Sequence, residues 1–194
     1  DAYEKATARA KYVADLCDQS ALVARILHAT IAHGYVKSID TTEAEAVPGV
    51  VKVLTCFNVP DYRFPTAGHP WSTEPAHQDV ADRLLLNRHV RYYGDDIAAV
   101  IAENEIAAAQ AVRALKVEYE ELPFYIDPEE AMKEDAYPIH EGGNIAEVVN
   151  LNQGDVDAGM KEADLVFEDR YSLPAIHHSA IETHAALASY DANG

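Results

Sequence analysis

The sequence predicts an α+β fold, in which strands and short helices share one chain without strict alternation. Three observations support this prediction. The first is the presence of apolar runs of strand length, and the second is a set of apolar residues at helical spacing after a capping residue. The third is the close spacing of Pro and Gly residues after residue 121. Because 48% of the 194 residues are hydrophobic, the chain can bury a core.

Two strands are expected near the beginning of the chain. Leu22–Leu27 and Gly34–Ile39 are rich in strand-forming residues, and His33-Gly34 breaks the pattern between them. We expect these two strands to pair or lie close together.

A strand-helix-strand unit continues from there. The Thr42 hydroxyl can cap the third following amide while the Glu45 carboxylate reaches back, which is the capping box that begins a helix. Pro48-Gly49 ends this helix after few residues, and the β-branched run Val50–Thr55 predicts the next strand.

A second unit of the same kind begins at Ile97–Ala102, an apolar run that predicts a central strand buried on both faces. Asn104 can cap the following helix. Apolar positions of that helix recur at helical spacing, at Ile106, Ala109, Val112 and Leu115. Lys116–Glu120 alternates and predicts a half-exposed strand.

Closely spaced Pro and Gly residues between Leu122 and Asn150 predict a domain boundary, with a linker over 126–145 and, after it, a segment too short to bury a core alone. Short helices are expected at Glu129–Lys133 and from the capping residue Asp155 to Glu162. Strands are expected around Leu165–Tyr171 and at Ala185–Tyr190. Between the two units, Asp61–Asn87 is long enough to be a functional or partner-facing loop.

Charge and cysteine content exclude several classes of function. Fifteen Lys and Arg against 33 Asp and Glu give a net charge of -18, which repels nucleic acid and anionic membrane surfaces. The acidic residues are spread along the chain, which favours a solvated surface over a site for a basic partner protein. No apolar run approaches a membrane span, and Cys17 and Cys56 have no disulfide or zinc spacing, so we expect a cytoplasmic protein.

The strongest candidate for chemistry is the group His177, His178, Glu182 and His184. Imidazoles and a carboxylate at this spacing can ligate zinc or relay protons, with Glu182 and His184 on one face of a strand. Polar residues at the mouth of a sheet are the alternative, and the sequence favours it, because no further metal ligand follows at a fixed spacing.

The other chemical residues predict structural roles. Four histidines are interpreted as surface or loop residues with hydrogen-bond partners: His28, His33, His69 and His77. Glu118, Glu120 and Glu121 are interpreted as a solvated strand edge. There is no GxSxG elbow around a nucleophile, and Gly142-Gly143 is an isolated pair rather than part of a phosphate-binding loop.

Many short segments of the chain occur in a recognisable order. In the first domain they are Asp1-Ala2, Lys5–Thr7, Ala10–Tyr12, Ile31–His33, Ile39-Asp40, Ala46–Val50, Val90–Asp95, Ile97–Val100 and Val117–Pro123. Further on they are Pro138–His140, Asn144, Gly154–Val156, Ala163-Asp164 and His178–Ala188. In this order the segments resemble the molybdenum-binding subunits of the xanthine dehydrogenase and aldehyde oxidase family. The chain departs from the family at Ala8, where Gly is common, and at Gln19-Ser20, where a Pro-Gly turn often stands.

The resemblance implies that residues 1–125 form an α/β-hammerhead domain and that 146–194 begin a larger molybdopterin-binding domain. It implies a molybdenum-molybdopterin cofactor in the full-length protein, with 2Fe-2S clusters and FAD in partner domains or subunits. Four features of the family's active site match no residue of this chain. They are the glutamine-containing loop beside the cofactor, the glycine-rich stretch, the Arg that faces the substrate and the glutamate that acts as a base. No catalytic, cofactor-binding or metal-binding residue is therefore assigned to this chain, and we expect it to be inactive alone.

The activity implied by the resemblance is hydroxylation of a small heterocycle with oxygen derived from water. The loop Thr66–Trp71 is most similar to bacterial members that oxidise purines, which favours xanthine or hypoxanthine. Nicotinate, another N-heterocycle or an aldehyde is the alternative substrate, and a standalone interaction module is the alternative function. The chain begins without Met and ends in a turn-like Asp191–Gly194, so we expect an excised segment that exposes apolar surface and can also form a homodimer.

Overall fold

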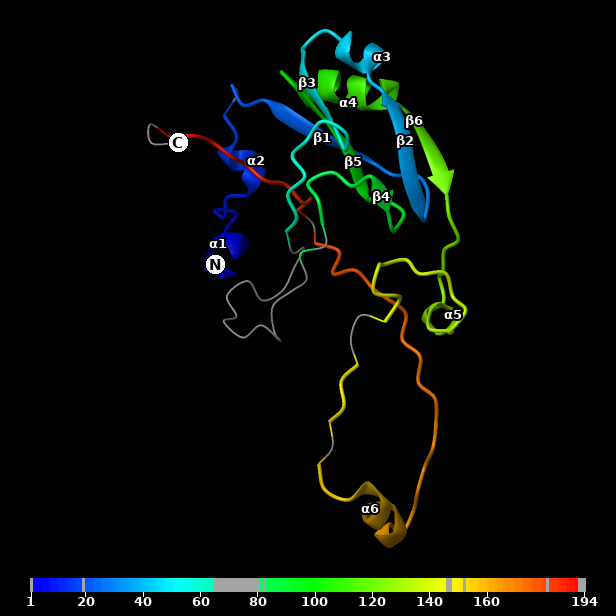
Figure 1. Ribbon diagram of the computed structural model, residues 1–194. Coiled ribbons are helices and arrows are strands. Elements are labelled where there is room, and N and C mark those ends of the chain that lie inside the picture. The colour runs from blue at the N-terminus through cyan, green and yellow to red at the C-terminus, as the bar shows by residue number, and fades with distance from the viewer. Residues whose placement is uncertain are drawn as a thin grey trace. The chain divides into compact units, whose positions relative to one another are not determined.

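The computed structural model describes residues 2–18, 20–64, 81, 83–145, 148–151, 153–180 and 182–191 (Figure 1). The chain forms two compact units. The larger unit is Ser20–Ala146, and the smaller one combines Asp1–Gln19 with Glu147–Gly194. Strands and helices mix along the larger unit, which confirms the predicted α+β class.

The larger unit contains most of the regular structure. Its elements are β1 (Val23–His28), β2 (Gly34–Asp40), α3 (Thr42–Glu45), β3 (Val50–Thr55), β4 (His89–Val90), β5 (Asp96–Ala102), α4 (Glu105–Ala114), β6 (Lys116–Glu121) and α5 (Pro128–Ala131). These strands make two antiparallel three-stranded sheets, in the orders β1-β5-β3 and β4-β2-β6.

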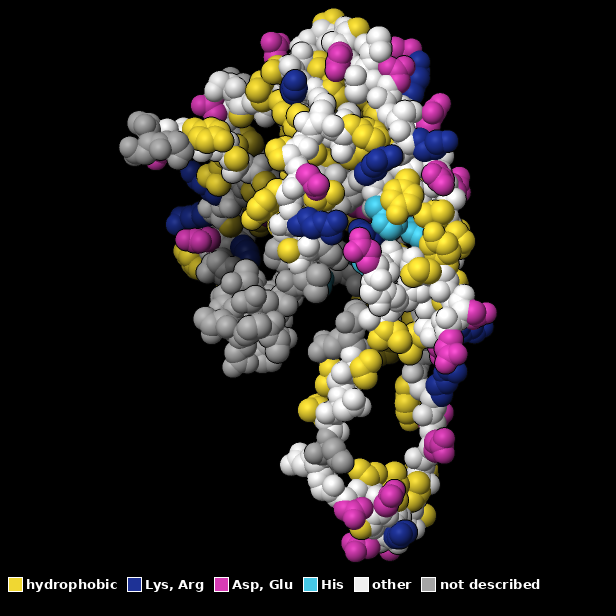
Figure 2. All heavy atoms as spheres, viewed as in Figure 1, with side chains coloured by type: hydrophobic (Ala, Val, Ile, Leu, Met, Phe, Trp, Pro, Cys, Tyr) yellow, Lys and Arg dark blue, Asp and Glu magenta, His cyan; other side chains and the backbone are white. Residues whose placement is uncertain are grey.

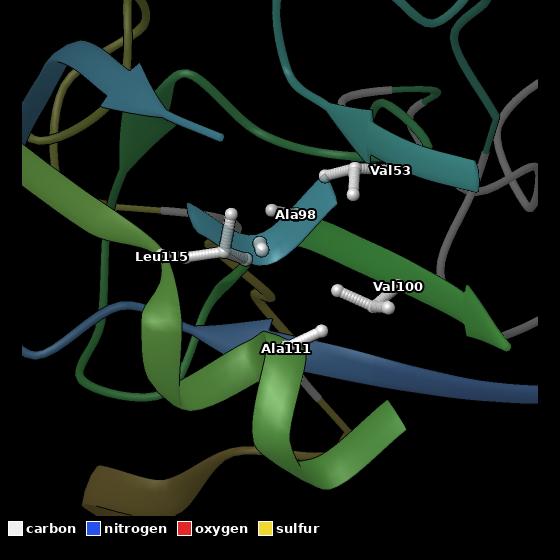
Figure 3. Packing of buried hydrophobic residues seen from close by; sticks show 6 residues of the cluster. Val53, Ala98, Val100, Ala111 and Leu115 are labelled. Carbon is white, nitrogen blue, oxygen red and sulfur yellow. The ribbon is translucent and has the colours of Figure 1, made fainter. Parts of the chain in front are cut away.

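Strand β5 lies at the centre of the first sheet and is buried on both faces, as predicted. On one face, Ala98 and Val100 pack against Ala111 of α4 and Val53 of β3 (Figure 3). On the other face, the fully buried Ile97 joins a cluster with the second sheet. Each large aliphatic side chain buried in this way contributes about 1.5–3 kcal/mol to folding.

Strands β1 and β2 do not pair, so of the two alternatives expected for them, pairing or lying close together, pairing is wrong. β1 pairs with β5, whereas β2 pairs with β4 and β6. The connection between them does not form a tight surface turn, because Ala29 and Ile31 are buried in the cluster between the sheets. Gly34 then begins β2, where a Cβ would lie 2.1 Å from the backbone oxygen of Glu120. Only glycine allows β6 to approach this closely.

The helix caps confirm the predictions at α4 and contradict them at α3. The Asn104 side chain accepts a hydrogen bond from the Ala107 amide at 2.9 Å, as expected for an N-cap. At α3 the capping residue is Thr41, without a side-chain cap, and no capping box forms at Thr42. Instead, Asp40 Oδ1 accepts from the Thr42 amide at 3.0 Å. Hydrogen bonds from Thr42 lower the pKa of the Asp40 carboxyl.

The segment that follows β6, which we expected to be a linker, lies within the larger unit. Helix α5 begins at Pro128, where Asp127 caps the Glu129 amide at 2.8 Å. Asn144 accepts a hydrogen bond from the Ile139 amide at 2.7 Å and donates to the carbonyls of Ala131 and Tyr137 at 2.9 and 3.0 Å. This one side chain therefore holds three points of the segment together.

The smaller unit has helices α1 (Ala2–Ala6), α2 (Val13–Leu16) and α6 (Val156–Glu162). The first two were not predicted, whereas α6 has the predicted cap, with Asp155 accepting from the Ala158 amide at 2.9 Å. The strands predicted around Leu165–Tyr171 and at Ala185–Tyr190 are wrong, since these residues are exposed and have no regular structure. A strand needs a partner for its backbone, and the described residues of the smaller unit supply none.

The described helices are all too short or too polar to cross a membrane. Acidic side chains are scattered over the face shown in Figure 2 and do not form a single patch.

Candidate functional site

The histidine-rich group near the C-terminus is not assembled into a site. His177, His178, Glu182 and His184 are all exposed and lie outside any strand, so the expectation that Glu182 and His184 share a strand face is wrong. Glu182 accepts a hydrogen bond from the Val13 amide at 3.2 Å, within the smaller unit. In the described part of the chain, no three potential metal ligands come together.

Two of the predicted structural histidines lie at the ends of strands. His28 is exposed, and its Nδ1 is 2.9 Å from Asp96 Oδ1. His33 is a loop histidine with partners, as expected, but it is buried with only 1% of its surface exposed. His69, His77 and the loop Thr66–Trp71 lie outside the described residues.

The carboxylates of β6 and the two cysteines have structural surroundings. Glu118, Glu120 and Glu121 are exposed along the edge strand, where Glu118 accepts from Ser38 Oγ at 3.0 Å. Cys17 is exposed and Cys56 half-buried, and both are free thiols. Burial raises the pKa of the Cys56 thiol to about 11, which disfavours the reactive thiolate.

A buried carboxylate organises the loop between β4 and β5. Asp95 is 2% exposed, and its Oδ1 accepts from Asn87 Nδ2 at 2.8 Å. The Arg83 guanidinium lies 3.3 Å from the same oxygen and donates to the Tyr92 hydroxyl at 2.9 Å. A buried carboxylate must be paired and hydrogen-bonded to offset its lost hydration, and these groups supply both. The site therefore has a structural role that the Arg91–Asp95 motif alone did not reveal.

A histidine pair links the second sheet to the segment after β6. His33 Nδ1 lies 2.6 Å from the Pro123 carbonyl, so it must carry the proton of this hydrogen bond. His33 Nε2 lies 3.0 Å from His89 Nε2, and Tyr35 stacks on His89 with ring centroids 4.4 Å apart. The Tyr137 ring packs edge-on against the His33 ring, with the ring centroids 5.7 Å apart. His89 was not singled out in the sequence, and only its position opposite Tyr35 in the sheet reveals the pair.

No described side chains fit the molybdenum cofactor that the family resemblance implies. The residues after Ala146 that the structure describes are exposed except Ala158, and these residues form no cradle around a ligand. We therefore assign no step of any reaction to a cofactor held by this chain.

Two known domain families match the sequence of this chain. The aldehyde oxidase and xanthine dehydrogenase a/b hammerhead domain matches residues 7–123. The chain belongs to this family. The molybdopterin cofactor-binding domain matches residues 139–194, so the family's second domain begins within the chain.

Individual members of the family are similar over nearly the whole chain. The xanthine dehydrogenase molybdenum-binding subunit of Escherichia coli O157:H7 is 40% identical over 188 residues, which cover 97% of this chain and 25% of that protein. The nicotinate dehydrogenase large molybdopterin subunit of Eubacterium barkeri is 36% identical over 195 residues, covering 100% of this chain and 43% of that protein. The chain thus spans less than half the length of either relative.

A solved structure supports the same family. The aldehyde oxidoreductase from Desulfovibrio desulfuricans is 36% identical, with a TM-score of 0.62 over 74% of this chain and 16% of that one. The predicted combination of a hammerhead domain and the start of a molybdopterin-binding domain is therefore confirmed.

Proposed function

We propose that this chain is the N-terminal part of the molybdenum-binding subunit of a hydroxylase that oxidises a purine, xanthine or hypoxanthine. The observation that carries the proposal is the succession of two matches in one chain, hammerhead at 7–123 and molybdopterin-binding from 139. The product oxygen comes from water, and the electrons pass to 2Fe-2S clusters and FAD in partner domains or subunits.

The proposed domains are the hammerhead at 1–125, a connecting segment at 126–145 and the beginning of the molybdopterin-binding domain at 146–194. The compact unit Ser20–Ala146 supports a boundary near residue 145. Both cysteines are free thiols, which supports the reducing cytoplasm as the location.

The apolar side chains of the second domain support a larger parent protein. Leu151 and Leu173 are each 93% exposed, Tyr190 is 92% exposed and Phe167 is 88% exposed. Burying one such side chain would contribute about 1.5–3 kcal/mol of free energy to folding. We therefore propose that the remainder of the subunit covers them. In its absence, a second copy of the chain is the alternative cover, and the chain alone has no activity.

The substrate class rests on similarity to relatives. The 40% identity to a xanthine dehydrogenase subunit favours a purine. The 36% identity to a nicotinate dehydrogenase subunit supports another N-heterocycle as the second candidate. Specificity is set by side chains around the reacting atoms, and the proposal assigns none of those to this chain.

The experiment is a metal and activity assay of the full-length protein purified with its partner subunits. Molybdenum is measured by mass spectrometry, and reduction of an electron acceptor is measured with xanthine, hypoxanthine and nicotinate. The 194-residue chain is the control. We expect molybdenum and purine-dependent turnover in the full-length protein and neither in the control.

Turnover with nicotinate but not with purines would show that the proposed substrate is wrong and that the proposed enzyme class is right. If the full-length protein contained no molybdenum and showed no turnover, the proposal of a molybdenum hydroxylase would be contradicted. The alternative, an interaction module, would then be favoured.

A further inference from the structure

The outer face of the sheet β4-β2-β6 carries a row of basic and aromatic side chains. Tyr35 lies opposite His89 in the antiparallel pair of β2 and β4. His33 and Arg91 stand two residues from them in the same direction, and therefore on the same face. The 3.0 Å contact between the His33 and His89 Nε2 atoms agrees with this register.

Arg91 is the unusual member of this row. Its side chain is half-buried, and its Nε is shielded from solvent without a hydrogen-bond partner. No carboxylate in the described ranges forms an ion pair with its guanidinium, although the chain has 33 Asp and Glu. The nearby Arg83, in contrast, is paired with Asp95. Burying a guanidinium N–H without an acceptor costs free energy, so this position favours a ligand that supplies an acceptor.

The Arg91 backbone amide donates to the buried Asp95 carboxylate at 3.4 Å, but among the described residues that carboxylate pairs with Arg83 and not with the Arg91 guanidinium. Burial, together with electrostatic repulsion from Arg91, His33 and His140, lowers the pKa of His89 to about 4. Tyr35 and Tyr137 contribute aromatic rings, and β6 adds two exposed acids to this face, Glu120 opposite Tyr35 and Glu118 two residues away.

We propose that Arg91, with His89 beside it, is a binding site for an oxyanion, either a carboxylate or a phosphate group. A guanidinium binds both through two parallel N–H···O bonds. This site is independent of the molybdenum chemistry proposed above.

The hydrogen-bond pattern gives His89 a second role. Because His33 Nδ1 donates to the Pro123 carbonyl, neutral His33 accepts from His89 through its Nε2. When His89 gains a proton it keeps this bond and acquires a second N–H donor. A bound oxyanion therefore raises the pKa of His89, and by reciprocity the oxyanion binds more tightly as pH falls toward that pKa.

The test is an NMR titration of the histidine rings in the full chain with inorganic phosphate and, separately, acetate. Sodium chloride at equal ionic strength is the reference. We expect a saturable shift of the His89 signals and a rise of about one unit in its pKa. The preferred anion, phosphate or acetate, then identifies the chemical class of the occupant.

Substitutions of Arg91 decide whether the site is real. Arg91→Gln should weaken binding by about tenfold or more, while raising the pKa of His89 in the absence of anion, because a like charge is lost. Arg91→Lys keeps the charge but loses the planar fork and should bind with intermediate affinity. Arg113→Gln, an exposed arginine on α4, is the matched control and should bind like the parent chain.

The proposal is overturned if neither anion gives a saturable shift beyond that of sodium chloride. Equal binding by the parent chain and Arg91→Gln also overturns it. If Arg91→Gln does not fold, Arg91→Lys decides, and affinity equal to that of the parent then counts against the site.

Discussion

The larger unit and the C-terminal segment 148–191 contain similar apolar residues, but these residues are buried in the first region and exposed in the second. Ile97, Val36 and Val90 are fully buried between the two sheets, whereas Leu151, Leu173 and Tyr190 are more than nine-tenths exposed. The strands of the first region find partners within residues 23–121, whereas the expected strands of the second find none. The comparison teaches that apolar content becomes stability only where a partner surface is available.

The largest expected difference is between a matched pair of truncations. Ile97→Ala leaves a cavity between the sheets and should lower the free energy of unfolding by about 3 kcal/mol. Leu173→Ala removes an exposed side chain and should change it by less than about 0.5 kcal/mol. Urea denaturation followed by circular dichroism measures both. A large loss from Leu173→Ala would show that its segment is already packed.

A substitution of the buried Asp95 tests whether the stability of the larger unit also depends on its buried ion pair and hydrogen bonds. Asp95→Asn should lower the free energy of unfolding by about 2 kcal/mol, because Arg83 loses its charged partner and Asn87 its strongest acceptor. Asp135→Asn makes the same change at an exposed position and should have no effect on thermal unfolding. Equal melting temperatures for the two variants would contradict the role of Asp95.

The two helix caps sharpen the comparison, because the same local interaction occurs in both regions. Asn104→Ala should lower the global stability by about 1 kcal/mol, since α4 packs on the first sheet. Asp155→Ala should speed amide hydrogen exchange within α6 and leave urea denaturation of the larger unit unchanged. Loss of global stability in Asp155→Ala would mean that α6 folds cooperatively with the sheets.

The smallest effect is expected at Ala8, at the end of α1. Ala8 has φ of 55°, and the Arg9 amide donates to the Glu4 carbonyl at 2.8 Å while the Ala8 amide donates to Lys5 at 3.2 Å. This is the Schellman pattern, which favours glycine at this position. Ala8→Gly should relieve strain and raise helicity slightly, with a gain of up to about 1 kcal/mol. Unchanged or lower helicity by circular dichroism would contradict it.

The sequence by itself determined the elements that local interactions decide. The apolar run of β5, the Asn104 and Asp155 caps and the alternation of β6 were all predicted, because each depends on residues within a few positions. The family was also identifiable from the order of short segments. At Ala8, where the family commonly has Gly, the backbone has the left-handed φ of 55° that Gly adopts readily.

Only the tertiary structure decided which strands pair and which side chains meet. The placement of β1 and β2 in different sheets depends on burying both faces of β5, which periodicity does not specify. His33 and His89 are 56 residues apart in sequence, and Arg91 stands out only because its shielded Nε has no hydrogen-bond partner among the described residues. Contacts of this kind arise from long-range packing, whose free energy is fixed by the whole fold rather than by neighbouring residues.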